Sequence, residues 1–140
     1  MIKARKNYFN LSKNHIVLRG VWEHNGWTII YDPEMVDAVN DVAMKQLSRT
    51  LKRHVLTFTV LNNTGTYSFA KYNSIQERGF MANDGQVKEN FGNPLKEETG
   101  LNINENISED DIRRLINRFG VDPSSSDSGA FTVVEVADKN

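Results

Sequence analysis

Residues 15–31 alternate between apolar and polar side chains, which predicts a β-hairpin. Asn25-Gly26 is the preferred turn of a type I′ hairpin, because both turn positions need a positive φ. With that turn, Trp22 pairs with Ile29. The apolar face then carries Ile16, Leu18, Trp22, Trp27, Ile29 and Tyr31. The opposite face carries Val17, Arg19, Val21, Glu23, Thr28 and Ile30. A slip of one residue would bury charge, so the register is fixed by the pattern.

The sequence pattern over residues 33–53 predicts the main helix. Asp32 is the expected N-cap, and Pro33 suits the first helical position, where its missing N–H costs nothing. Apolar residues recur at steps of three and four at Val36, Val39, Ala43, Leu47 and Leu51. Acidic residues gather at the start and basic residues at the end, which complements the helix dipole.

Residues 55–91 predict a meander of antiparallel strands over 55–61, 66–72 and 75–82, followed by a return strand. Asp84-Gly85 forms the last hairpin turn. Pairing of Ala82 with Val87 would place one set of apolar side chains on a common face, namely Phe80, Ala82, Val87 and Phe91.

In the rest of the chain, the sequence predicts a long loop over residues 92–107. A second helix is expected to start after Ser108 and end at Gly120, and a last strand to span 131–136. Runs of consecutive strands argue for an α+β fold. We expect one domain over residues 1–140, with an antiparallel meander of about six to seven strands and two helices packed on one face. The N-terminal extension 1–13 and the Ser-rich loop 123–129 would be flexible.

The composition excludes several classes of function. The absence of cysteine excludes a disulfide scaffold, a zinc finger and a thiol nucleophile. No apolar run approaches the roughly 20 residues that span a bilayer, and no signal peptide is recognisable, so we expect a cytoplasmic protein with no membrane contact. The net charge is −1, but residues 1–70 carry nine basic against five acidic residues, whereas residues 71–140 carry eight against thirteen.

No catalytic motif emerges from the sequence. Neither a P-loop nor a G-x-G-x-x-G fingerprint is present. His15, His24 and His54 lack the spacing of metal ligands, so we predict no metal, no cofactor and no catalytic residues. A small enzyme or ligand carrier built from dispersed residues remains an alternative, and it would need a polar pocket between sheet and helix.

A basic cluster at the end of the first predicted helix consists of Lys45, Arg49, Lys52 and Arg53. These side chains share one side of the helix and could contact phosphates of a nucleic acid. Complementation of the helix dipole explains the same residues without any partner. A nucleic-acid-associated accessory protein is therefore an alternative function, although the net charge of −1 does not favour nucleic acid as a partner.

The acidic segment, residues 97–111, is the most distinctive surface feature that the sequence predicts. Its carboxylates are Glu97, Glu98, Glu105, Glu109, Asp110 and Asp111. The last three begin the second helix, where capping accounts for them, although Asp110 remains a candidate. We predict that Glu97, Glu98 and Glu105, with Asp110, contact a basic protein partner, because charge complementarity speeds encounter and sets specificity. A solvated loop with no partner is the alternative.

Four stretches of the chain together resemble a group of small bacterial proteins: Leu47-Ser48-Arg49, Val55 to Val60, Tyr67 to Tyr72, and Gly92-Asn93-Pro94-Leu95-Lys96-Glu97-Glu98. The last stretch is similar to their G-x-P-L-x-E-E loop, with Lys96 where such loops often carry Pro. The resemblance covers roughly residues 27–123. Many of these proteins are uncharacterised, and some are similar to immunity proteins encoded beside polymorphic toxins. The resemblance implies a non-enzymatic protein that neutralises a partner, such as a toxin, by docking on it.

The sequence also allows the chain to self-associate. Strand 131–136 and the first hairpin could each form the edge of a sheet, and such an edge can pair across a two-fold axis to form a homodimer.

Overall fold

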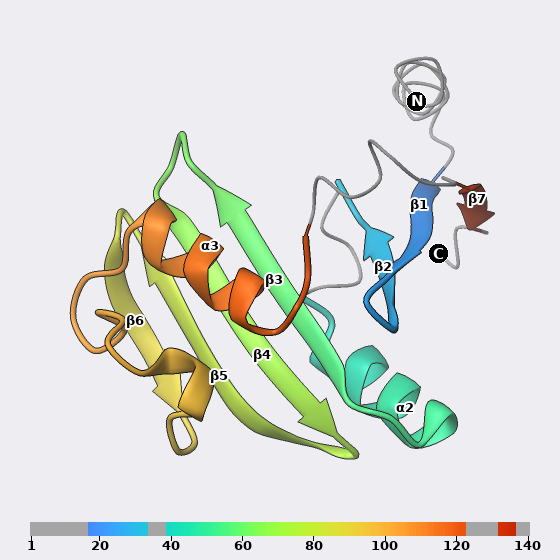
Figure 1. Ribbon diagram of the computed structural model, residues 1–140, viewed down its shortest axis with the longest axis horizontal. Coiled ribbons are helices and arrows are strands. Elements are labelled where there is room, and N and C mark those ends of the chain that lie inside the picture. Colours follow the sequence, from blue (N-terminus) through green and yellow to red (C-terminus); the bar gives the residue numbers. More distant parts are fainter. Residues whose placement is uncertain (1–16, 34–38, 123–131, 137–140) are drawn as a thin grey trace. The chain divides into compact units, whose positions relative to one another are not determined.

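The computed structural model describes residues 17–33, 39–122 and 132–136 (Figure 1). The chain divides into two compact units, residues 1–34 with 120–140 and residues 35–119. The predicted extension 1–13 and Ser-rich loop 123–129 lie outside the described residues. The expectation of a single domain over residues 1–140 stays a prediction.

The first unit contains a three-stranded antiparallel sheet in the order β2-β1-β7. Its strands are β1 (Val17–His24), β2 (Trp27–Tyr31) and β7 (Thr132–Val136). Asn25 and Gly26 have φ values of 50° and 76°, as a type I′ turn requires. The predicted hairpin register is confirmed, since Trp22 pairs with Ile29.

Arg19 is buried, although the sequence predicted it on the face opposite the apolar one. Its side chain is only 3% exposed and forms an ion pair of 3.4 Å with Asp32. A buried guanidinium needs a partner, and Asp32, which directly follows β2, supplies a carboxylate. The first turn of a helix capped by Asp32 would fall on residues 34–38, which lie outside the described residues, so this cap stays a prediction.

The second unit contains a four-stranded antiparallel meander in the order β3-β4-β5-β6. The strands are β3 (Val55–Leu61), β4 (Thr66–Asn73), β5 (Ile75–Asn83) and β6 (Gln86–Phe91). Asp84 and Gly85 have φ values of 51° and 72° and form the predicted hairpin turn. Ala82 pairs with Val87, as predicted.

A β-bulge in the β5–β6 pairing overturns one detail of the predicted meander. The register shifts next to Met81, so that Glu89 faces Met81 and Phe91 faces Gly79. The extra residue of a bulge reverses the side to which later side chains point. Phe91 is therefore not on the predicted apolar face, and it is 56% exposed.

The helix of the predicted 33–53 segment is shorter at both ends. Helix α2 spans Asp41–Leu51, and Asn40 is its N-cap, because its side chain accepts a hydrogen bond from the Ala43 N–H. Lys52 has a left-handed backbone, which ends the helix before residue 53. Residues 34–38 lie outside the described residues.

The two described helices contact opposite faces of the meander, contrary to the predicted packing on one face. On one face, Met44 of α2 packs with Ala70 and Tyr72 of β4. On the other face, Phe69 of β4 stacks on Phe119 at the end of helix α3 (Glu109–Arg118), which lies across the sheet in Figure 1. Successive side chains of a strand point to opposite faces, so β4 is buried on both sides and each helix covers one.

The predicted α+β class with antiparallel sheets is confirmed. The single meander of six to seven strands is instead divided between two sheets of three and four strands. None of the described helices has both the length and the apolar character needed to cross a membrane.

Candidate functional site

The loop that follows β6 is held to the sheet by a buried ion pair. Arg78 of β5 is fully buried, and its guanidinium meets the carboxylate of Glu98 in the short 3₁₀ helix η1 (Lys96–Glu98). The contact is bidentate, with Nε to Oε2 at 2.9 Å and Nη2 to Oε1 at 2.6 Å. Such paired hydrogen bonds fix geometry as well as charge.

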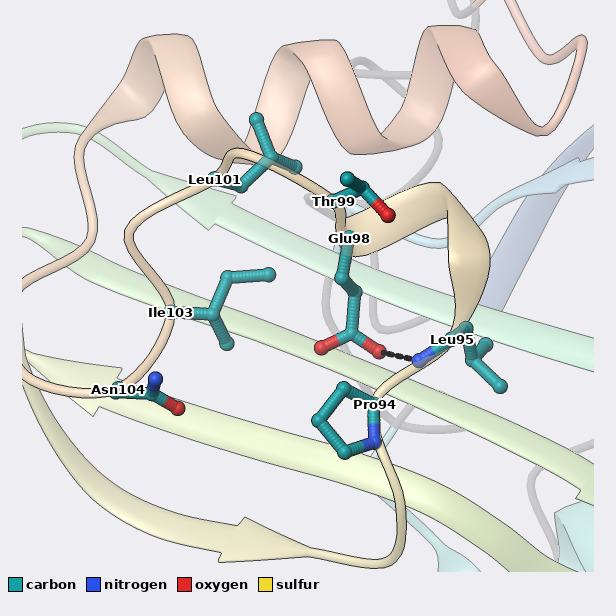
Figure 2. A pocket seen from close by; sticks show the side chains of 7 residues that line it. All are labelled: Pro94, Leu95, Glu98, Thr99, Leu101, Ile103 and Asn104. Carbon is teal, nitrogen blue, oxygen red and sulfur yellow. Dashed lines mark hydrogen bonds between the residues drawn. The ribbon is translucent and has the colours of Figure 1, made fainter.

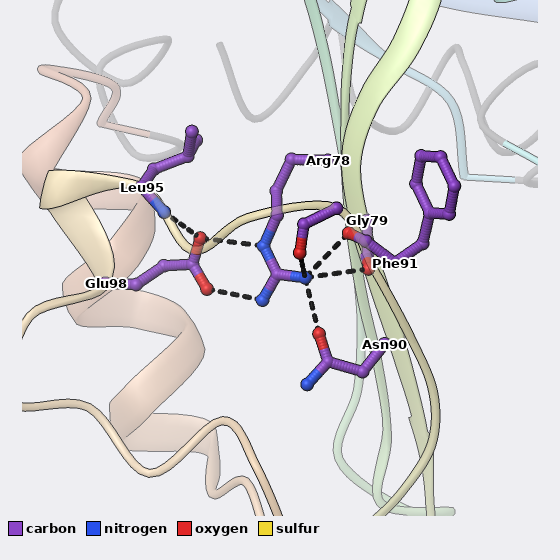
Figure 3. A network of polar contacts seen from close by, with 7 residues as sticks. Arg78, Gly79, Asn90, Phe91, Leu95 and Glu98 are labelled. Carbon is purple, nitrogen blue, oxygen red and sulfur yellow. Dashed lines mark hydrogen bonds and ion pairs between the residues drawn. The ribbon is translucent and has the colours of Figure 1, made fainter.

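The remaining guanidinium nitrogen of Arg78 holds the end of β6. Nη1 donates to the carbonyl of Phe91 at 2.7 Å and to the side-chain oxygen of Asn90 (Figure 3). Glu98 also accepts a hydrogen bond of 2.7 Å from the Leu95 N–H. Arg78 therefore ties three segments together: its own strand, the end of β6 and η1.

Gly92 begins this loop and cannot be replaced without movement. Its φ is +79°, and a Cβ atom there would lie 2.2 Å from the Glu77 carbonyl oxygen. Only glycine allows this backbone to pass so close to β5. Within the G-x-P-L-x-E-E motif, the glycine and the final glutamate thus have structural roles.

The far end of the loop is held at the hairpin turn between β5 and β6. The Ile107 N–H donates to the Gly85 carbonyl at 2.8 Å, and the Val87 N–H donates to the Glu105 carbonyl at 2.9 Å. Gln86 and Asn106 form a β-bridge between these bonds. The segment from Gly92 to Ile107 is therefore anchored to the sheet at both ends.

A small pocket of about 140 Å³ lies inside this loop (Figure 2). Its lining residues are Pro94, Leu95, Glu98, Thr99, Leu101, Ile103 and Asn104. Pockets that enclose drug-sized ligands are usually about 300–1,000 Å³, so this pocket is too small for one. Its one carboxylate, Glu98, is already bound to Arg78.

Glu98 is not the exposed partner-binding residue that the sequence predicted. The residue is 6% exposed, and both carboxylate oxygens are bound. The physical reason is Arg78, since a fully buried guanidinium needs an anion beside it. Arg78 lies twenty positions earlier in the chain, so no local pattern shows the pairing.

The other three predicted partner-binding residues lie in three different segments: Glu97 in η1, Glu105 in the loop and Asp110 in α3. The carbonyl of Glu97 accepts a hydrogen bond from Arg118 at the C-terminal end of the helix. Asp110 begins the helix and forms an exposed ion pair of 2.9 Å with Arg114. Asp110 and Arg118 are eight positions apart in the helix, a rise of about 12 Å. Glu105 is exposed and lies beside β6.

Pairing further reduces the charge of the acidic segment. Glu109 binds Arg113 at 2.6 Å, and Asp111 accepts two hydrogen bonds from Ser108 at the helix cap. Among the described residues, the side chains of Glu97 and Glu105 form no ion pair. These two therefore carry the least compensated charge of the segment.

Asp84 is an acidic residue that the sequence analysis missed. It is exposed in the turn before β6, beside the strand-like contact that holds residues 105–107. Asp84 and Glu105 therefore lie at the same end of the meander, and Asp110 follows Glu105 by five positions in the chain. The Asp84-Gly85 pair predicts a hairpin turn, and that role says nothing about where the Asp84 carboxylate lies relative to the loop.

The predicted basic cluster lies around the end of α2. Lys45 forms an ion pair of 2.7 Å with Asp41, one helical turn earlier. Arg49, Lys52 and Arg53 are exposed, and Lys52 is the left-handed residue that ends the helix. Asp41 also accepts a hydrogen bond of 2.7 Å from the Tyr72 hydroxyl. The hydrogen bonds from Lys45 and from Tyr72 lower the pKa of Asp41.

No cluster of three or more His, Asp or Glu side chains suited to hold a metal ion occurs in the described part of the chain. No protein-family model, curated protein or solved structure matches this chain.

Proposed function

We propose that this chain is a non-enzymatic protein that neutralises a basic protein partner by docking on it. The supporting observation is the double anchoring of the loop from Gly92 to Ile107, by Arg78–Glu98 at one end and by the backbone bonds of residues 105–107 at the other. A surface that is already ordered loses little entropy on binding, so its carboxylates can recognise a partner efficiently.

Glu105 and Asp110 are the proposed centre of the contact, with Asp84 beside them and Glu97 at the margin. Glu98 is excluded because it is buried. The mechanism would combine steric occlusion of the partner with charge complementarity, which acts mainly on the association rate. The resemblance of the loop to immunity-like proteins suggests a toxin as the partner.

The test uses the product of the reading frame adjacent to this one as the probe, measured by titration calorimetry with the full chain. Replacing Glu105→Lys and Asp110→Lys together should weaken binding at least tenfold, and added salt should weaken the wild-type complex. Glu23→Lys, an exposed acid in the first unit, is the matched control and should bind as wild type. A complex with unchanged affinity after both reversals would contradict the proposal.

The nucleic-acid alternative has a test of its own. A single-stranded oligonucleotide is titrated at low salt in a filter-binding assay with the full chain. We expect no retention, because Lys45 is already paired with Asp41 and the remaining cations are few. Retention that Arg49→Ala and Arg53→Ala abolish would favour the nucleic-acid function instead.

A further inference from the structure

The two edges of the four-stranded meander differ in how they are protected. Edge strands offer unpaired backbone groups, and proteins usually shield them with charges, bulges or a covering segment. Strand β6 has all three devices: Lys88 and Glu89, the register shift beside Met81, and the covering contact with Asn106. It is therefore closed to a further strand.

Strand β3 forms the other edge, and in the part of the chain that the structure describes it has none of these devices. Its sequence, Val-Leu-Thr-Phe-Thr-Val-Leu, contains no charge, proline or glycine over seven residues. Its register with β4 runs without a shift from Val55 to Leu61. Among the described residues, no strand pairs with its outer side. Such an edge is a template for another strand.

The sequence of β3 is also self-complementary about Phe58. In an antiparallel pair of two β3 strands centred there, Phe58 would face its own copy, Thr57 would face Thr59, and Leu56 would face Val60. Val55 would face Leu61. Every pair joins like side chains, and aromatic, threonine and aliphatic cross-strand pairs are among those that stabilise antiparallel sheets.

The aromatic row of the meander supports the same centre. Phe58, Phe69 and Phe80 lie directly opposite one another on three neighbouring strands. Their ring centroids are 5.2 Å and 5.8 Å apart, with Phe69 in the middle. A two-fold axis beside Phe58 would continue this row into the equivalent row of the second copy, on the same face of the sheet.

We propose that the outer edge of β3 binds a second copy of this chain, which extends the meander to a continuous eight-stranded sheet across a two-fold axis. The interface is isologous, as in most homodimers. It differs from the edges that the sequence suggested, the first hairpin and strand 131–136, which belong to the other sheet.

The first test is light scattering during size-exclusion chromatography of the full chain. We expect a dimer for wild type and a monomer for Thr57→Lys, which introduces the charge that edge strands normally carry. Thr28→Lys, on the uncharged edge strand β2, is the matched control and should remain dimeric. Circular dichroism verifies that each variant is folded. A monomeric wild type, a folded dimeric Thr57→Lys or a monomeric Thr28→Lys would overturn the proposal.

The second test fixes the register and does not depend on Thr57→Lys folding. The chain has no cysteine, so Thr57→Cys and Thr59→Cys each introduce a single thiol. On oxidation, a mixture of the two variants should give a disulfide-linked dimer, because positions 57 and 59 face each other. Each variant alone should give little, because its two thiols are displaced by two residues. Equal crosslinking of the mixture and of the separate variants, or none in any sample, would overturn the β3 register.

Discussion

At the scale of single residues, the pairing of Arg78 with Glu98 distinguishes two adjacent glutamates that the sequence treats alike. Glu98 neutralises a fully buried guanidinium, whereas the side chain of Glu97 has no ion pair among the described residues. Removing one partner of a buried ion pair costs about 3–5 kcal/mol, because the other charge stays buried.

We therefore expect Glu98→Gln to lower the free energy of unfolding by about 3 kcal/mol or more. Glu97→Gln, one residue earlier, should change it by less than about 0.5 kcal/mol. Urea unfolding followed by circular dichroism measures both. Equal effects of the two substitutions would mean that the buried pair does not hold the loop.

Tyr72 is a single residue through which the stability of the fold depends on pH. Burial, followed by the hydrogen bond to Asp41, raises the pKa of Tyr72 above its ordinary value. A raised pKa in the folded state means that the stabilisation is fully present below the unfolded pKa of about 10 and is lost as the pH rises above it. The wild-type free energy of unfolding should therefore fall above about pH 10.

Tyr72→Phe removes this ionisation, so its stability should depend less on pH in that range. At neutral pH it should lose about 0.5–1.5 kcal/mol with the hydrogen bond to Asp41. Urea unfolding at a series of alkaline pH values measures both effects. A Tyr72→Phe profile as steep as wild type would contradict the assignment.

At the scale of elements, the loop after β6 depends on a close approach as well as on an ion pair. Gly92 and Gly100 have nearly equal φ values, +79° and +76°, but only Gly92 has a backbone atom in the way of a Cβ. Gly100→Ala should therefore cost only the left-handed backbone, about 1–2 kcal/mol.

Gly92→Ala should cost at least about 3 kcal/mol in unfolding free energy, because the Glu77 carbonyl must also move. Displacement of Gly92 would disturb the neighbouring carbonyl of Phe91, which Arg78 binds. The same urea experiment compares the two alanine variants. If Gly100→Ala proved as costly as Gly92→Ala, the close approach would not be the reason for the glycine.

The elements that the sequence predicted correctly are those whose signals are local. Asn25-Gly26 and Asp84-Gly85 set the two hairpins, and the alternation of residues 55–61 set β3. A positive φ and a two-residue period are properties of neighbouring residues, so they can be read without a fold.

Most of the errors arise from contacts between distant residues or from shifts of register. The burial of Glu98 depends on Arg78, and the burial of Arg19 depends on Asp32. The β-bulge beside Met81 places the side chain of Phe91 on the face opposite to the predicted apolar one. The start of α2 at Asp41 depends on the cap at Asn40, which competes with the Asp32-Pro33 signal. Within the candidate site, the burial of Glu98 could not be predicted because a charge pattern does not reveal burial.

At the scale of the whole molecule, the sequence of the second unit is inserted between the two segments that form the first unit. Strand β1 pairs with β7 near the opposite end of the sequence, from Val17 with Val136 to Val21 with Thr132. Residues 35–119 are continuous and form the second unit. The first sheet therefore closes only when both ends of the chain meet, whereas the meander needs no residue outside its own span.

This difference predicts that residues 35–119 fold alone. Their core is internal: the four strands pair with one another, Phe69 packs on Phe119, and Ile112 and Leu115 of α3 are fully buried. The isolated segment should give dispersed amide resonances and a cooperative urea transition. The isolated segment 17–33 should remain unstructured, because a two-stranded hairpin without its third strand is at best marginally stable.

Phe69→Ala within the 35–119 segment should abolish the transition, since it removes the ring shared by β4 and the end of α3. A 35–119 segment with collapsed resonances would show instead that the inserted unit needs the sheet that surrounds it in sequence.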